Sequence, residues 1–211
     1  MELLKRLGLK AFNAVKSELI GIGIFVGVIW LAFFADAFLP LDQLALSPRR
    51  LTGLPGILAM PFLHGDFGHL LSNSVPLFIL LALMAGSRAN TWKVVGAIIV
   101  VSGLLLWIAG FPSTVYLGAS MLVFGLIGFL VPAGFIEKRP VPIVISILVA
   151  LMYGGTFIWG MLPMSKTTSE LAHFYGAITG VALAFVFSRK PPEGTTLADS
   201  IPDIPGADLL K

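Results

Sequence analysis

The chain has 211 residues, of which 57% are hydrophobic and 12% are charged, and its mean hydropathy is +0.95. A soluble domain carries about 25% charged residues, so this composition excludes an ordinary soluble fold, and the absence of cysteine excludes disulfides and thiol chemistry. The formal charge of +3 comes from basic residues that are too few and too scattered to indicate a nucleic-acid partner.

The start of the chain predicts a basic segment, an apolar span and a long loop. Residues 1–17 carry four Lys or Arg side chains, and residues 19–39 are apolar. This stretch is too long for the core of a cleaved signal peptide, and no small-residue cleavage site follows it, so we expect an uncleaved first span. Residues 40–68 are partly apolar and contain Pro and Gly, which favours a loop in or near the membrane interface.

Five further apolar stretches match the hydrocarbon core of a bilayer, which is roughly 30 Å thick. Their predicted bounds are 69–86, 94–109, 117–135, 141–161 and 171–187. We therefore predict an all-α polytopic protein with six transmembrane helices in one domain, residues 18–190. A short N-terminal segment, 1–17, precedes this domain, and a polar, proline-rich tail, 191–211, follows it as a flexible segment.

The basic residues also predict the orientation of the chain in the membrane. With the N-terminus in the cytoplasm, only three of the 14 Lys and Arg residues fall on the outer side, namely Arg49, Arg50 and Lys166. Because cytoplasmic loops carry the excess of Lys and Arg, we expect both termini in the cytoplasm. Topology thus explains the positive charge, and the lipid bilayer is the expected surrounding.

Polar residues inside membrane spans are costly and are candidates for function. Three such places stand out: residues 64–73, residues 118–120 and His173. In the predicted orientation each lies at the outer start of an inward-running span, the second, fourth or sixth. Six helices can bring these three starts together around one water-accessible site.

The residue types at these places can supply the parts of a serine hydrolase. His69 and Asn73 are four residues apart, so they share a helical face, and both can donate hydrogen bonds. Ser120 near a helix start offers its own amide as a third donor. A serine hydroxyl needs a base to become a nucleophile, and His173 is the candidate base.

Small residues favour close packing of the fourth and sixth spans, which these roles require. Gly176, Gly180 and Ala184 repeat every four residues after His173, and small residues let membrane helices approach closely. The fourth span carries Gly118, Gly125 and Gly128.

Each signal also has a plainer interpretation. A single intramembrane serine usually bonds a neighbouring carbonyl, a single histidine near a helix end is often interfacial, and glycine spacing is often only packing. A metal site at His64, Asp66 and His69 lacks a completing ligand and a shared helical face. A proton-coupled transporter would favour acidic residues within the spans, whereas those here lie in loops or at span ends.

Taken together, the three motifs resemble the rhomboid intramembrane serine proteases over roughly residues 18–190. The matching patterns are His64-x4-His69-x3-Asn73, Gly118-x-Ser120 and His173-x2-Gly176-x3-Gly180. The resemblance implies a rhomboid-like bundle in which Ser120 is the nucleophile and His173 the base, without an acid and without a cofactor. It implies that His69 and Asn73, beside Gly118, support an oxyanion site, and that the ring of Phe124 stacks on the base.

Two positions depart from the family's pattern. Met121 follows the serine where the family usually has Gly, and we expect its side chain to line the substrate cleft. The Trp-Arg pair of the family's first loop is missing, and Arg49-Arg50 is no clear substitute.

The resemblance implies a serine endopeptidase that cleaves transmembrane segments of other membrane proteins, in a bacterial inner membrane. An inactive rhomboid-like relative that binds membrane clients is the alternative. Such relatives typically lose the serine or the histidine, and both are present here.

Overall fold

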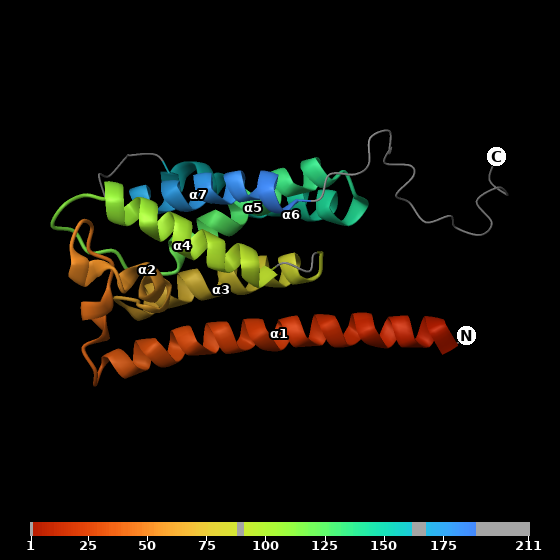
Figure 1. The fold of residues 1–211 in the computed structure, drawn as a ribbon, viewed down its shortest axis with the longest axis horizontal. Coiled ribbons are helices and arrows are strands. Elements are labelled where there is room, and N and C mark those ends of the chain that lie inside the picture. The colour runs from red at the N-terminus through yellow and green to blue at the C-terminus, as the bar shows by residue number, and fades with distance from the viewer. Residues whose placement is uncertain (1, 88–90, 162–167, 189–211) are drawn as a thin grey trace.

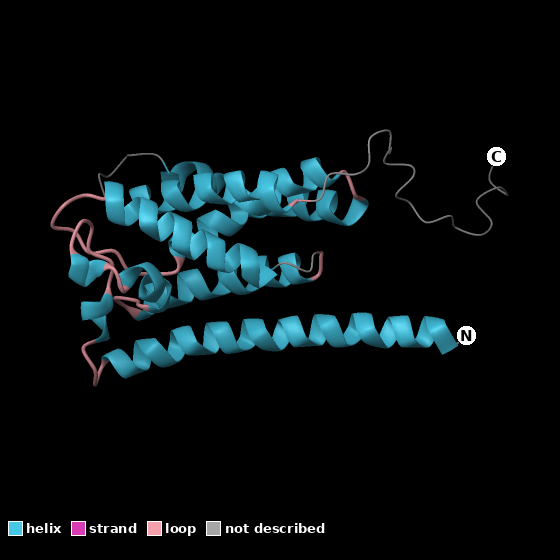
Figure 2. Cartoon of the chain, viewed as in Figure 1, coloured by secondary structure: helices cyan, strands magenta, loops and turns pink. Residues whose placement is uncertain are grey.

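The computed structural model describes residues 2–87, 91–161 and 168–188. Regular structure in these residues is helical, apart from one β-bridge between Leu46 and Tyr116 (Figures 1 and 2). Six helices are long and apolar enough to cross a membrane, which confirms the predicted all-α, six-span fold. They are α1 (Glu2–Asp36), α3 (Phe67–Ala85), α4 (Thr91–Ala109), α5 (Ser120–Glu137), α6 (Pro140–Met161) and α7 (Thr168–Phe187).

The predicted loop between the first two spans is built from short helical turns. These are η1 (Leu41–Leu44), η2 (Leu51–Gly53), α2 (Gly56–Ala59) and η3 (Met60–Phe62). They cover one end of the bundle, at the left in Figure 1. Hydrogen bonds of 2.9 Å fix the loop to the end of α4: the Arg49 amide donates to the Trp107 carbonyl, and the Trp107 indole donates to the Arg50 carbonyl.

Several predicted span limits differ from the helix ends, because α1 already begins within the predicted N-terminal segment and α4 and α7 each begin three residues early. Two further differences have a local cause. Helix α1 ends at Asp36 rather than residue 39, and the Asp36 carboxylate accepts the amide of Asp42 at 2.9 Å as the chain turns away. Helix α5 begins at Ser120 rather than residue 117, because Gly118 has φ of +111° and cannot be part of a right-handed helix. The predicted tail, 191–211, lies outside the described residues.

Helix α5 lies at the centre of the bundle, and most of its length is buried by the other helices. Helix α1 is peripheral and exposes most of its surface (Figure 1). It packs on α3, where the Trp30 indole donates a 3.0 Å hydrogen bond to the hydroxyl of Ser74.

Glycines bring the backbones of α5 and α7 into direct contact. A Cβ atom added at Gly176 would lie 2.1 Å from the Met121 carbonyl oxygen, and one added at Gly180 would lie 2.0 Å from that of Gly125. Both contacts advance by four residues on both helices, so the two helices run parallel. The contact confirms the packing predicted from the glycine repeat, and its register places Ser120 level with the turn that carries His173.

We expect Gly180→Ala to destabilise the fold, because the added methyl group would force the two backbones apart. Overpacking of a well-packed contact typically costs about 1–3 kcal/mol. Gly27→Ala on α1 is the matched control, since no described atom lies within 4 Å of a Cβ at that position. Unfolding in mixed detergent micelles would measure both variants, and equal stability of the two would contradict the close contact.

Candidate active site

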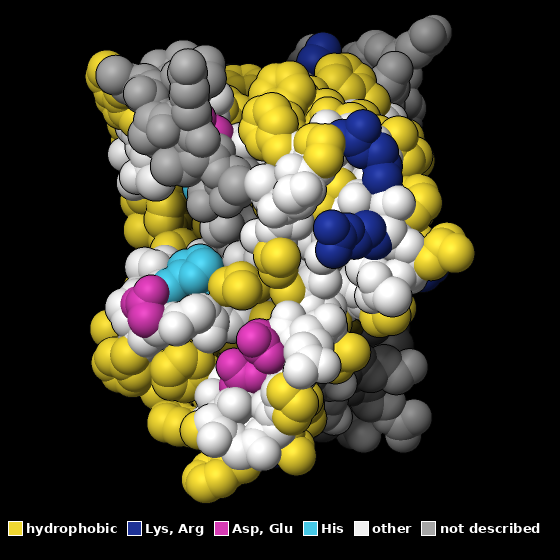
Figure 3. Space-filling view, turned by 90° about the vertical axis from the view of Figure 1, so that its left-hand side faces the viewer, with side chains coloured by type: hydrophobic (Ala, Val, Ile, Leu, Met, Phe, Trp, Pro, Cys, Tyr) yellow, Lys and Arg dark blue, Asp and Glu magenta, His cyan; other side chains and the backbone are white. Residues whose placement is uncertain are grey.

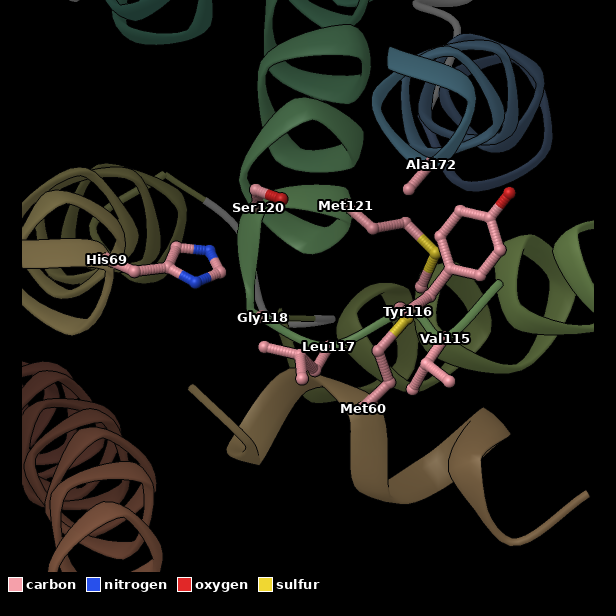
Figure 4. Close-up of a pocket in the computed structure, with 9 residues that line it drawn as sticks. All are labelled: Met60, His69, Val115, Tyr116, Leu117, Gly118, Ser120, Met121 and Ala172. Carbon is pink, nitrogen blue, oxygen red and sulfur yellow. The ribbon is translucent and has the colours of Figure 1, made fainter. Parts of the chain in front are cut away.

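A cavity of about 150 Å³ opens at the end of the bundle that carries the first loop. Figure 3 looks onto this end, where basic side chains gather on one part of the surface and a histidine lies on another. The cavity is lined by residues of the first loop, of α3, of the segment before α5, of α5 itself and of α7 (Figure 4). These residues are Met60, His69, Val115, Tyr116, Leu117, Gly118, Ser120, Met121 and Ala172. The cavity thus brings together three of the five predicted site residues.

Ser120 is the first residue of α5, so its amide has no partner within the helix. The two amides before it are already bonded: that of Gly118 donates to the Met60 carbonyl at 2.9 Å, and that of Ala119 donates to Nε2 of His64 at 3.4 Å. No hydrogen bond within the described part of the chain uses the Ser120 amide. It is therefore the one of these three donors that is available beside the Ser120 hydroxyl.

His64 supports the segment that precedes the nucleophile candidate. Its side chain is buried, and its Nε2 can accept the Ala119 amide only when that nitrogen carries no proton. Burial, helped by the neighbouring charge of His69, lowers the pKa of His64 from 6.5 to about 4, so the ring is neutral at pH 7. The sequence marks His64 as part of a motif, but its contact with Ala119 has no local signal, because the two residues are 55 positions apart.

His69 and Asn73 approach Gly118 from α3. The Asp66 carboxylate begins this helix by accepting the His69 amide at 2.8 Å. A Cβ atom at Gly118 would lie 2.6 Å from Nε2 of His69 and 3.6 Å from Nδ2 of Asn73. Only glycine permits both the left-handed φ and this close approach, which explains the residue at that position.

The amide of Asn73 is a buried donor without an acceptor. Its side chain is 6% exposed, and its Nδ2 has no hydrogen-bond partner among the described residues. A buried polar group that lacks a partner costs about 1–3 kcal/mol. Such a donor beside Gly118 is suited to bind an oxygen that arrives with a ligand.

The ring of His173, a residue of α7, is held in place by one contact with α5 and one with α6. Its ring is parallel to that of Phe124, with ring centroids 4.0 Å apart and an angle of 3° between planes, which confirms the predicted stacking. Its Nδ1 lies 2.9 Å from the carbonyl oxygen of Gly160 on α6. His173 does not line the cavity, and no hydrogen bond between it and Ser120 is present in the described residues.

Met121 has its backbone at the α5–α7 contact and its side chain in the cavity lining. Figure 4 shows that side chain pointing away from Ser120 toward Tyr116. The side chain is fully buried and packs in one apolar cluster with Met60, Tyr116 and Ala172. Met121 thus lines the cavity beside Ser120, and its expected place in a substrate cleft stays a prediction. The walls formed by Met60 and Tyr116 were not anticipated.

Comparison with known proteins finds one family model and several mycobacterial relatives. The family model for the Rhomboid domain matches residues 52–190. The uncharacterized proteins Rv1337 of Mycobacterium tuberculosis and Mb1372 of Mycobacterium bovis are each 31% identical over 166 residues, which are 74% of this chain and 69% of theirs. The uncharacterized protein ML1171 of Mycobacterium leprae is 30% identical over 175 residues, or 78% of this chain and 68% of its own.

We expect stability to fall as the pH drops from 7 to 4, with His64 as one cause. The unfolded chain binds a proton at His64 near pH 6.5, whereas the folded chain binds it only near pH 4. The contribution of His64 to the free energy of unfolding is therefore complete above pH 6.5 and is lost as the pH falls from 6.5 to about 4. The loss is on the order of 3 kcal/mol, at about 1.4 kcal/mol per pKa unit.

His64→Gln keeps a hydrogen-bond acceptor but does not titrate. Unfolding free energies of both proteins in mixed micelles, at pH 7 and pH 4, would therefore show a smaller pH dependence in the variant. Identical pH dependence in the two proteins would contradict this role of His64.

Proposed function

Because this chain belongs to the rhomboid family, we propose that it is an intramembrane serine endopeptidase. The observation that supports this most is the surroundings of Ser120. Its hydroxyl borders a cavity, its amide has no partner within the described residues, and the unpartnered amide of Asn73 lies against the same segment. Donors placed beside a nucleophile are what acyl transfer requires.

In the proposed reaction, the Ser120 hydroxyl attacks the carbonyl carbon of the scissile peptide bond. His173 takes the hydroxyl proton as the C–O bond forms, and then gives it to the nitrogen of the leaving amine as the C–N bond breaks. A water molecule, activated by the same histidine, hydrolyses the acyl-enzyme. Proton transfer needs the Ser120 hydroxyl within hydrogen-bond reach of His173, about 2.6–3.2 Å. Because no such hydrogen bond is present in the described residues, the reaction requires Ser120 and His173 to move together.

The carbonyl oxygen becomes negative during the attack and needs donors. The Ser120 amide, the Asn73 amide and the His69 ring are proposed to supply them, since all three lie around Gly118. Donors that are already in place cost no reorganisation when the negative charge develops.

The substrates are proposed to be transmembrane segments of other membrane proteins. A helix hides its peptide carbonyls in hydrogen bonds, so a substrate must unwind locally, and Gly, Pro or small residues near the membrane surface favour this. The six spans and the mycobacterial relatives indicate a bacterial membrane protein. We propose that its two termini face the cytoplasm.

We expect Ser120→Ala and His173→Ala each to abolish cleavage of a model transmembrane substrate, because a nucleophile and its base act as a unit. Both variants should remain folded. Ser120→Ala should keep the unfolding free energy of the parent within about 1 kcal/mol, whereas His173→Ala also removes the contact with the Gly160 carbonyl and the stack on Phe124 and should be destabilised by about 1–3 kcal/mol. Labelling with a fluorophosphonate should also disappear in Ser120→Ala. Near-parental turnover in either variant would contradict the assignment, and a parent that neither cleaves nor labels would support a client-binding relative.

We expect Asn73→Leu to lower turnover on the order of 100-fold, which corresponds to about 3 kcal/mol for one oxyanion donor. Its stability should be unchanged or higher, because leucine has a similar volume and removes a buried donor that lacks a partner in the described structure. Single-turnover cleavage and unfolding would be measured on the same preparation. Unchanged turnover would exclude Asn73 from the oxyanion site.

A further inference from the structure

The carbonyl group of Gly160 fixes which nitrogen of His173 carries the proton. The two atoms, Nδ1 of His173 and the carbonyl oxygen of Gly160, lie 2.9 Å apart. A carbonyl oxygen can only accept a hydrogen bond, so Nδ1 must be the donor. The neutral ring therefore holds its proton on Nδ1 and leaves the lone pair on Nε2.

Helix α6 also supports the ring of His173 indirectly, through the ring of Phe124. Phe157 on α6 stacks on Phe124 with centroids 5.7 Å apart and 19° between planes, and Phe124 in turn stacks on His173. The ring of His173 can neither flip nor tilt without breaking the Gly160 bond or the stack. Two positions on one helix, Phe157 and Gly160, thus restrain both its tilt and its rotation.

Glycine at position 160 is what allows this contact. A Cβ atom there would lie 2.5 Å from Cζ of Phe124 and 3.5 Å from Nδ1 of His173. Any larger residue would push away either the Phe124 ring, which disturbs the stack on His173, or the α6 backbone, which lengthens the hydrogen bond to His173.

We propose that the Gly160 carbonyl is a positioning group for His173 and takes the place that a carboxylate holds in a three-residue serine hydrolase. This inference rests on the proposed function. During attack, the proton of the Ser120 hydroxyl moves to Nε2, while the Nδ1 proton stays in place and donates to the Gly160 carbonyl. The carbonyl gains no proton and stabilises the imidazolium through its dipole.

Nitrogen NMR of the histidine rings tests the proposal directly. The full chain, without a histidine tag and with 15N in its three histidine side chains, would be studied in lipid nanodiscs, and the His173→Ala spectrum would identify the His173 signals. We expect the neutral Nδ1–H form for His173. The Nε2–H form would overturn the proposal. If His173→Ala does not fold, the spectra of His64→Gln and His69→Gln identify the His173 signals by elimination.

Gly160→Ala tests the effect on catalysis, with Gly155→Ala as its control on the same helix. No described atom lies within 4 Å of a Cβ at position 155. We expect Gly160→Ala to lower turnover by about 100-fold, the usual effect of misplacing a reacting group by about 1 Å, and to mix the two ring forms. Gly155→Ala should change neither. A loss of turnover in Gly160→Ala with an unchanged ring form would overturn the proposal.

Glu170→Gln separates the carbonyl from the carboxylate that lies one turn before His173 on α7. The ring form of His173 should be the same in this variant, and a switch to the Nε2–H form would assign the orienting role to Glu170 instead. The ring form can be read in Ser120→Ala protein, which has no nucleophile. Failure of the positioning role is therefore distinguishable from failure of the protease function, which fluorophosphonate labelling reports.

Discussion

The contact between the backbones of α5 and α7 is the constraint on which the candidate site depends. Ser120 and His173 come from helices that are separated by the 30 positions 138–167, and no hydrogen bond joins the two residues in the described structure. Their common level comes from the glycines at this contact, among them Gly176 and Gly180, which let α7 rest on main-chain oxygens of α5. Within a bilayer, where lipid is as apolar as a leucine side chain, close packing of this kind holds helices together.

A second support acts on the segment that leads into α5. The first loop contributes Met60 and His64, which bond the amides of Gly118 and Ala119 and so define the turn before Ser120. Hydrogen bonds from the same loop to Trp107 fix it to the end of α4. The loop that joins the first two membrane helices is thus part of the framework that orients the nucleophile candidate.

The sequence predicted the features that depend on side-chain type and spacing. The six apolar helices, the close approach at Gly176 and Gly180 and the stacking of Phe124 on His173 all follow from such patterns, and the structure confirms them. The sequence could not predict the contact between His173 and the Gly160 carbonyl, because every residue carries a carbonyl group. The start of α5 was misjudged because Leu117 and Gly118 extend the apolar run although Gly118 has a left-handed backbone. The chemical roles of Ser120 and His173 are still proposals.

The glycine contact has a consequence for how the sequence can vary through evolution. Because α5 and α7 meet through main-chain atoms, their association makes no demand on the identity of the side chains that face lipid, such as Phe185 and Val186. Those positions are free to exchange one apolar residue for another, while the contact positions accept almost no substitution. Descendants of such a chain can therefore diverge widely in overall identity and keep the same helix pairing, as long as a few residues without side chains are inherited.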